Sequence, residues 1–131
     1  MAMNDAPLIA IVDDDVMVCE ATEDLVETFG FNARTFTSAG EFLNSDCVDR
    51  TLCLISDVQM PGMSGLQLHR KLIASGRRIP VIFITAFPDE RVRKQALRAG
   101  AVCYLSKPFD GESLLGCIRS ALGYEKGNTD A

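Results

Sequence analysis

LIAIVDDD at residues 8–15 is the stretch that decides the fold, because five apolar residues run directly into three aspartates. A strand that is apolar at every position is typical of a parallel sheet with helices on both faces. Further apolar runs recur at steady intervals, at residues 31–36, 52–55, 81–84 and 101–105. The run at 31–36 also carries Asn32 and Arg34, so we expect it to form a more exposed edge strand.

Helix signals fill the intervals between these runs. Ser38 and Ser64 each open a capping box, and Asp110 is a further N-cap, because short polar side chains there accept hydrogen bonds from free N–H groups of the first turn. Pro88 suits the first turn of a fourth helix. The inward face of that helix is predicted at Val92, Ala96 and Ala99. Glycines that suit helix ends follow at Gly30, Gly76, Gly100 and Gly123.

The alternation of five apolar runs with five helical segments predicts five βα units. Such units form a parallel sheet with right-handed crossovers and helices on both faces. We expect an α/β fold of the flavodoxin-like, doubly wound type, with strand order 2-1-3-4-5. The domain should span residues 8–123, preceded by a short extension at 1–7 and followed by a polar tail at 124–131 that frays.

Composition and charge narrow the classes of protein. A formal net charge of −5 disfavours direct binding to nucleic acid. No apolar run approaches the ~20 residues that span a bilayer, and residues 1–5 lack the basic segment of a signal peptide. We therefore expect a cytoplasmic protein without a membrane partner. The five cysteines include no C-x-x-C pair, so we expect free thiols that are buried as small apolar side chains.

Polar side chains gather where the predicted strands end. In a doubly wound sheet the ligand lies at the carboxyl ends of the strands, near the point where the strand order reverses. The residues at these ends are Asp13, Asp14, Asp15, Asp57, Thr85 and Lys107. Taken singly, each has a simpler interpretation as a helix cap, a turn residue or a surface lysine. Their joint placement predicts a Mg²⁺ site beside a carboxylate that can form an aspartyl phosphate.

Four motifs in this order resemble the receiver domains of two-component response regulators, in particular the FixJ-like subgroup that is usually joined to a LuxR-type helix-turn-helix domain. They are IVDDD at residues 11–15, DVQMPGMSG at 57–65, ITA at 84–86 and KPF at 107–109. The resemblance covers residues 8–122 and leaves open whether an output domain belongs to the protein. It implies a signalling switch rather than an enzyme, phosphorylated by a sensor histidine kinase or a phosphotransfer protein.

The resemblance also implies a role for each acidic residue of the site. Asp57 would be the phosphoacceptor and would share in binding Mg²⁺. Asp14 would bind the ion directly, Asp13 directly or through water, and Gln59 through its backbone carbonyl. Asp15 makes the acidic run one residue longer than the pair of the family, and we expect it to point along the start of the first helix.

Further roles follow from the resemblance, and one more, that of Phe87, from its place two residues after Thr85. Thr85 and Lys107 would contact the phosphoryl group, and Tyr104 would be the switch aromatic that moves inward as Thr85 moves toward the phosphate. The Lys107–Pro108 peptide bond is predicted to be cis. Phe87 would either shield the phosphoryl group from water or pack against the fourth helix.

The fourth helix carries a basic stripe. Its members, three and four residues apart and therefore on one face, are Arg91, Lys94 and Arg98. With Tyr104 nearby, the face of the fourth helix, fifth strand and fifth helix is predicted to be a phosphorylation-sensitive partner surface that forms a homodimer; the alternative is a solvated basic face. His69, the only histidine, is expected on the surface of the third helix, so the phosphodonor histidine must come from another protein.

Three other functions fit parts of the pattern. A flavodoxin-type FMN carrier shares the fold, but the aspartates at residues 13–15 would repel the FMN phosphate. An aspartyl phosphatase of the haloacid dehalogenase type needs a second aspartate where Gln59 stands. A receiver used only for docking or dimerisation would not need Asp57, Thr85 and Lys107 together, and a phosphorylation assay separates it from a phosphoacceptor.

Overall fold

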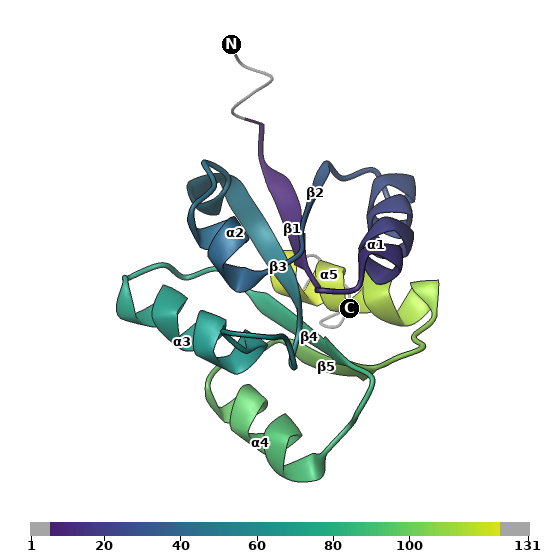
Figure 1. The fold of residues 1–131 in the computed structure, drawn as a ribbon. Coiled ribbons are helices and arrows are strands. Elements are labelled where there is room, and N and C mark those ends of the chain that lie inside the picture. Colours follow the sequence, from purple (N-terminus) through teal and green to yellow (C-terminus); the bar gives the residue numbers. More distant parts are fainter. Residues whose placement is uncertain (1–5, 124–131) are drawn as a thin grey trace.

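A five-stranded parallel sheet forms the centre of the protein, described here for residues 6–123 of a computed structural model (Figure 1). Its strands are β1 (Leu8–Val12), β2 (Ala33–Phe36), β3 (Thr51–Asp57), β4 (Val81–Thr85) and β5 (Cys103–Ser106). Their order is β2-β1-β3-β4-β5, with every pair parallel. This confirms the predicted flavodoxin-like order, including β2 at the edge.

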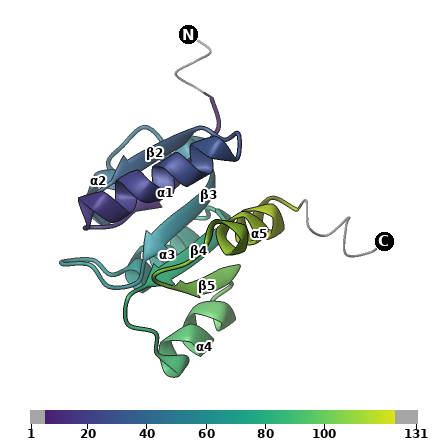
Figure 2. The ribbon, with the colours of Figure 1, turned by 90° about the vertical axis from the view of Figure 1, so that its right-hand side faces the viewer.

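Helices cover both faces of the sheet (Figures 1 and 2). Helices α1 (Val16–Thr28) and α5 (Gly111–Leu122) pack on one face. Helices α2 (Ala39–Leu43), α3 (Gly65–Ala74) and α4 (Glu90–Arg98) pack on the other, and a short 3₁₀ helix, η2 (Val48–Arg50), precedes β3. Strands β1 and β4 are buried at every position, which explains why their sequences are apolar throughout.

The register of the central strands brings their carboxyl ends together. Val12 of β1 lies opposite Ser56 of β3, and Asp57 lies opposite Ile84 of β4. The residues that follow β1 and end β3 and β4 therefore emerge side by side at one edge of the sheet. Parallel strands make this convergence general, and it creates the site described below.

Two expectations for α4 are wrong. Pro88 lies before the helix rather than in its first turn, because the Asp89 carboxylate accepts hydrogen bonds from the Arg91 and Val92 N–H groups and so caps the helix. Ala99 is exposed, and Leu97 packs against the core instead. The caps at Ser38, Ser64 and Asp110 are confirmed, since their side chains accept hydrogen bonds from N–H groups in the first turns of α2, α3 and α5.

The expectation that all cysteines are free is wrong for two of them. Cys103 of β5 and Cys117 of α5 form a disulfide, with Cα atoms 6.0 Å apart. Helix α5 packs on the face of the sheet that the Cys103 side chain enters and brings together residues 14 positions apart, a contact that the spacing of cysteines in the sequence does not reveal. Cys19, Cys47 and Cys53 are free and buried, as expected.

The predicted extension at 1–7 and tail at 124–131 lie largely or wholly outside the described residues. Within residues 6–123, no helix has both the length and the apolar character needed to cross a membrane.

Candidate functional site

Three carboxylates meet at the carboxyl ends of β1 and β3. Asp13 follows β1, Asp57 ends β3, and Asp14 comes next to Asp13. Each offers an oxygen atom within 4.8 Å of the other two. Asp13 is fully buried and Asp57 nearly so, whereas Asp14 is exposed. The cluster is therefore anchored in the sheet on one side and open to solvent on the side of Asp14.

Lys107, which follows β5, bridges two of these carboxylates. Its Nζ atom lies 2.8 Å from Asp13 Oδ2 and 3.4 Å from Asp57 Oδ2. Its backbone N–H donates to the carbonyl of Thr85 at 2.7 Å, which fixes the lysine to the end of β4. Removing one partner of a buried ion pair costs about 3–5 kcal/mol, because a charge is left uncompensated. Substitution of Lys107 or Asp13 alone should therefore destabilise the fold as well as disturb the site.

The electrostatics of the cluster depend on a balance of burial and charge. Burial and the neighbouring Asp13 charge raise the pKa of Asp57, while Lys107 and the Gln59 N–H oppose this and only partly offset it. Burial disfavours the charge on Lys107, but its hydrogen bonds and attraction to Asp13 and Asp57 outweigh burial and raise its pKa. The site therefore holds an excess of negative charge that a cation would stabilise.

Thr85 ends β4 and is almost fully buried. Its Oγ1 accepts a hydrogen bond from the Phe87 N–H at 3.0 Å, which leaves the hydroxyl hydrogen free to donate to a ligand. The Phe87 side chain is 69 % exposed. It therefore stands at the surface beside the site, and its exposure does not support the alternative that it packs against α4.

The loop after β3 is held close to Asp57. The Gln59 N–H donates to Asp57 Oδ1 at 3.3 Å, and the Gly65 N–H donates to the Val58 carbonyl at 2.8 Å. A Cβ atom at Gly65 would overlap the backbone carbonyl of Asp57. This role of Gly65 was not predicted from the sequence. The available signal was a glycine in the first position of a helix, where other residues are better helix formers.

Asp15 is kept apart from the cluster, as predicted. Its carboxylate accepts hydrogen bonds from the Met17 and Val18 N–H groups at 3.0 and 3.4 Å and caps α1. Its backbone N–H donates to Asp13 Oδ1 at 2.9 Å, which helps to orient Asp13. Asp13 and Asp14 therefore face the cluster, whereas the Asp15 carboxylate faces the first turn of α1.

Tyr104 lies on β5, opposite Phe83 of β4, and packs partly buried against the side of the core that α3 and α4 cover. Its hydroxyl accepts a hydrogen bond from the Asp89 N–H at 3.3 Å, at the start of α4. The structure thus places Tyr104 beside α4, as expected, and joins it to the helix rather than to the acidic cluster. The predicted cis bond between Lys107 and Pro108 is also confirmed.

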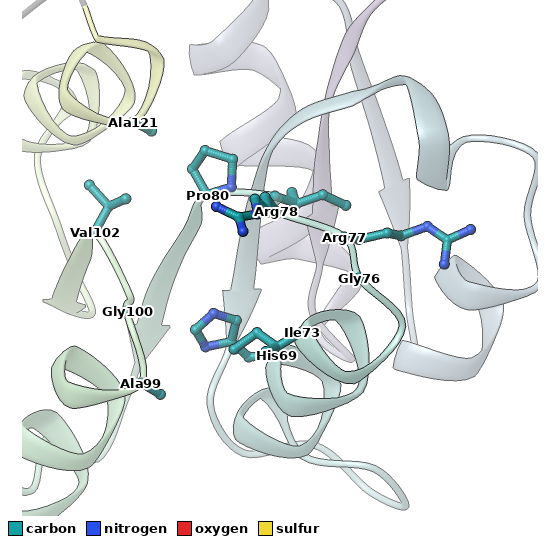
Figure 3. A pocket seen from close by; sticks show the side chains of 11 residues that line it. His69, Ile73, Gly76, Arg77, Arg78, Pro80, Ala99, Gly100, Val102 and Ala121 are labelled. Carbon is teal, nitrogen blue, oxygen red and sulfur yellow. The ribbon is translucent and has the colours of Figure 1, made fainter.

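His69 is not on the surface as expected. It is 5 % exposed, packs edge-on against Phe83 with ring centroids 5.8 Å apart, and its Nδ1 has no hydrogen-bond partner. Figure 3 shows the ring between α3 and the segment around Gly100, at a pocket of about 690 Å³. The available signal was its place in the buried stripe of α3, spaced i, i+3, i+4 and i+7, which consists of Gly65, Leu68, His69 and Leu72.

Part of the acid sensitivity of the protein should come from His69. Burial lowers its pKa in the folded state, so the unfolded state takes up this proton at the higher pH. The stability that neutral His69 contributes is complete above the unfolded pKa of about 6.5. It is lost as the pH falls from there toward the folded pKa, by at most about 1.4 kcal/mol per pH unit.

The variant His69→Leu removes this proton and isolates its effect. Between pH ~7.5 and ~5.5, its free energy of unfolding in urea should fall by less than that of the wild type. An equal fall in both proteins would show that His69 contributes nothing to the acid sensitivity.

The donor set at the acidic cluster fits a hard divalent cation. Mg²⁺ prefers oxygen ligands, uses one or two carboxylates and leaves other positions for water or a phosphate oxygen. The clustered oxygen atoms of Asp13, Asp14 and Asp57 meet this demand. The ammonium of Lys107 and the hydroxyl of Thr85 lie on the same edge and suit the oxygen atoms of an anion.

Comparison with known proteins gives consistent matches. Residues 9–119 match the family model described as response regulator receiver domain. The chain is 47 % identical over 121 residues to the response regulator protein TmoT of Ectopseudomonas mendocina, covering 92 % of this chain and 55 % of TmoT. It is 46 % identical over 117 residues to the response regulator protein TodT of Pseudomonas putida, covering 89 % and 52 %.

A solved structure supports the same relationship. The crystal structure of FixJ-N is similar with a TM-score of 0.81 at 32 % identity, covering 90 % of this chain and 94 % of that one. The chain spans about half the length of the curated relatives TmoT and TodT.

Proposed function

Because the chain belongs to the family of response regulator receiver domains, whose members are signalling switches rather than enzymes, we propose that it accepts a phosphoryl group on Asp57 in a Mg²⁺-dependent reaction. The observation that carries this proposal is the approach of Asp13, Asp14 and Asp57 oxygen atoms within 4.8 Å of one another, with the Lys107 ammonium beside them. Phosphoryl transfer depends mainly on such positioning and charge neutralisation.

The residues of the chain divide the work of phosphoryl transfer. A carboxylate oxygen of Asp57 attacks the phosphorus atom of the donor; the new O–P bond forms as the bond to the leaving group breaks, and the leaving group departs with its electron pair. Lys107 neutralises charge on the phosphoryl oxygen atoms, and the Thr85 hydroxyl donates a hydrogen bond to one of them. Asp13 holds Lys107 in place through the 2.8 Å ion pair.

Mg²⁺ would be held by the carboxylates of Asp13, Asp14 and Asp57 and by the backbone carbonyl of Gln59. When bound, it supplies a positive charge that orients the phosphoryl group and neutralises its oxygen atoms. The raised pKa of Asp57 supports this assignment, since burial and the Asp13 charge together favour a cation at the cluster.

The phosphodonor is a sensor histidine kinase or a phosphotransfer protein, and the reaction takes place in the cytoplasm. His69 cannot serve as an internal donor because it is buried on α3. The chain itself makes no direct contact with nucleic acid, in keeping with its net charge of −5. An output domain, where one is joined to the chain, would carry that contact.

Acetyl phosphate tests the proposal directly. Incubation of the wild type with acetyl phosphate and Mg²⁺ should add one phosphoryl group, about 80 daltons by intact mass. Removal of Mg²⁺ with a chelator should abolish the gain. Absence of any gain with Mg²⁺ present would instead favour a receiver that serves only for docking or dimerisation.

The output surface should be the face of α4, β5 and α5. Arg91, Lys94 and Arg98 are exposed along one side of α4, and Tyr104 joins β5 to the start of that helix through Asp89. Movement of Tyr104 therefore acts on this face first. We expect phosphorylation to tighten a homodimer here, with the basic stripe facing acidic groups such as Asp110 or Glu112 of a second copy.

Sedimentation with and without beryllofluoride, a phosphoryl mimic, measures this dimer. Allosteric coupling is typically ~1–3 kcal/mol, so the dimer should tighten by roughly 5- to 150-fold. Reversing the charges of Arg91, Lys94 and Arg98 together should abolish the change. If wild type and variant are monomeric and identical in both states, the homodimer is wrong and the surface serves another partner.

Phe87 should lengthen the life of the phosphorylated state. Its backbone N–H is held by Thr85 Oγ1, and its apolar, exposed ring stands where water would approach but cannot orient that water by hydrogen bonding. Phosphorylated Phe87→Ala should lose its phosphate faster than the wild type, as followed by intact mass. Equal rates would mean that the ring does not shield the phosphoryl group.

A further inference from the structure

A disulfide joins β5, the strand that carries Tyr104, to α5, the last helix of the described chain. Cys103 is the first residue of β5, Cys117 lies within α5, and the two form a disulfide. Their Cα atoms are 6.0 Å apart, which is within the range that a disulfide requires without movement of the backbone. The fold therefore places the two residues where the disulfide can form.

Cys103 is more accessible than the other described cysteines. Cys103 is partly exposed, whereas Cys19 and Cys53 are buried, and burial raises their pKa to about 11 and about 12. The thiolate is the reactive form of cysteine, so a buried thiol with a raised pKa is inert toward oxidants. Cys117 is 7 % exposed but lies in contact with Cys103.

We propose that Cys103 and Cys117 are a reversible redox modification site, oxidised by a hydroperoxide and reduced by a dithiol. The more exposed Cys103 thiolate attacks the peroxide, breaks the O–O bond and becomes a sulfenic acid while an alcohol or water leaves. Cys117 then attacks that sulfur and displaces water, so two thiols supply the two electrons that reduce the peroxide. In the cytoplasm that we propose for this chain, such disulfides are usually transient.

The disulfide would act through β5 on the proposed output surface, the face of α4, β5 and α5. This effect rests on the proposed function. Successive residues of a strand face opposite sides of the sheet. Cys103 packs with the α1 and α5 side, whereas Tyr104 packs with the α3 and α4 side, and Lys107 follows the same strand. Fixing Cys103 to α5 therefore restrains the backbone on either side of Tyr104. The oxidised protein should favour the conformation seen here and respond less to phosphorylation.

Counting thiols tests the redox site independently of phosphorylation. The full chain, first reduced, is exposed to hydrogen peroxide, unfolded and alkylated with N-ethylmaleimide for mass analysis. We expect three alkylated cysteines after oxidation and five after reduction again with dithiothreitol. Cys103→Ser should form no intramolecular disulfide, while Cys47→Ser is the matched control that keeps it. Five alkylated cysteines after peroxide, or a bond that dithiothreitol does not reverse, would overturn the proposal.

Beryllofluoride affinity tests the effect on the switch. Calorimetric titration in the presence of Mg²⁺ should give an affinity at least about fivefold weaker for oxidised than for reduced wild type. Cys103→Ser, treated with peroxide, should bind like the reduced protein. Equal affinities would overturn the link to phosphorylation. If the reduced protein does not bind beryllofluoride at all, the proposed function fails, and the thiol count still decides the redox site.

Discussion

Asp57→Asn should accept no phosphoryl group from acetyl phosphate, so its intact mass should lack the gain of about 80 daltons expected for the wild type. The reason is chemical, because an amide lacks the nucleophilic carboxylate that forms the acyl phosphate. The fold should survive the change, since asparagine keeps the shape of aspartate and Lys107 retains its 2.8 Å ion pair with Asp13.

Asp15→Asn is the matched control for this variant. Asp15 caps α1 through its side chain, and asparagine is an equally good N-cap. This variant should therefore gain the same mass as the wild type. If Asp57→Asn were phosphorylated to the same extent as the wild type, the phosphoacceptor would have to be a residue other than Asp57.

Mg²⁺ affinity should depend strongly on Asp14 and little on its neighbour Asp15. Asp14 is exposed and offers an oxygen atom to the acidic cluster, whereas the carboxylate of Asp15 is engaged by the Met17 and Val18 N–H groups. Asp14→Asn should weaken Mg²⁺ binding by at least about tenfold, because a charged ligand is lost at a site that uses few protein ligands. Asp57→Asn should weaken it to a similar extent.

Calorimetric titration of each variant with Mg²⁺ measures the difference. Asp15→Asn should keep an affinity close to that of the wild type, since its role at the helix is preserved. Equal losses in the variants of Asp14, Asp15 and Asp57 would mean that binding follows the overall negative charge rather than a defined set of ligands.

The strands and their order could be predicted because the signals for them are local. Strands buried on both faces must be apolar throughout, as in residues 8–12 and 81–84, and five βα units allow few arrangements. The acidic cluster followed from the same reasoning, because Asp13 and Asp57 come directly after apolar strands whose carboxyl ends meet. The start of α4 could not be predicted from local signals alone. Pro88 and Asp89 are adjacent, and each is a residue type that favours the beginning of a helix.

The missed features depend on contacts between distant parts of the chain. Cys103 and Cys117 meet only because α5 packs on the face of the sheet that the Cys103 side chain enters. His69 is buried only because α3 lies against Phe83, although the spacing of its helix carried a signal for this. The sequence of one segment does not by itself determine which side chains of a distant segment it contacts.

Gly65 shows that a position can tolerate no substitution even though its residue has no reactive side chain. It supplies no functional atom, yet α3 approaches β3 so closely there that any side chain would meet the Asp57 carbonyl. Substitution at this position would shift the backbone that carries Asp57, the proposed phosphoacceptor. The positions at which substitution should impair the site therefore outnumber the residues that react. They include Gly65, which contributes only the absence of a side chain.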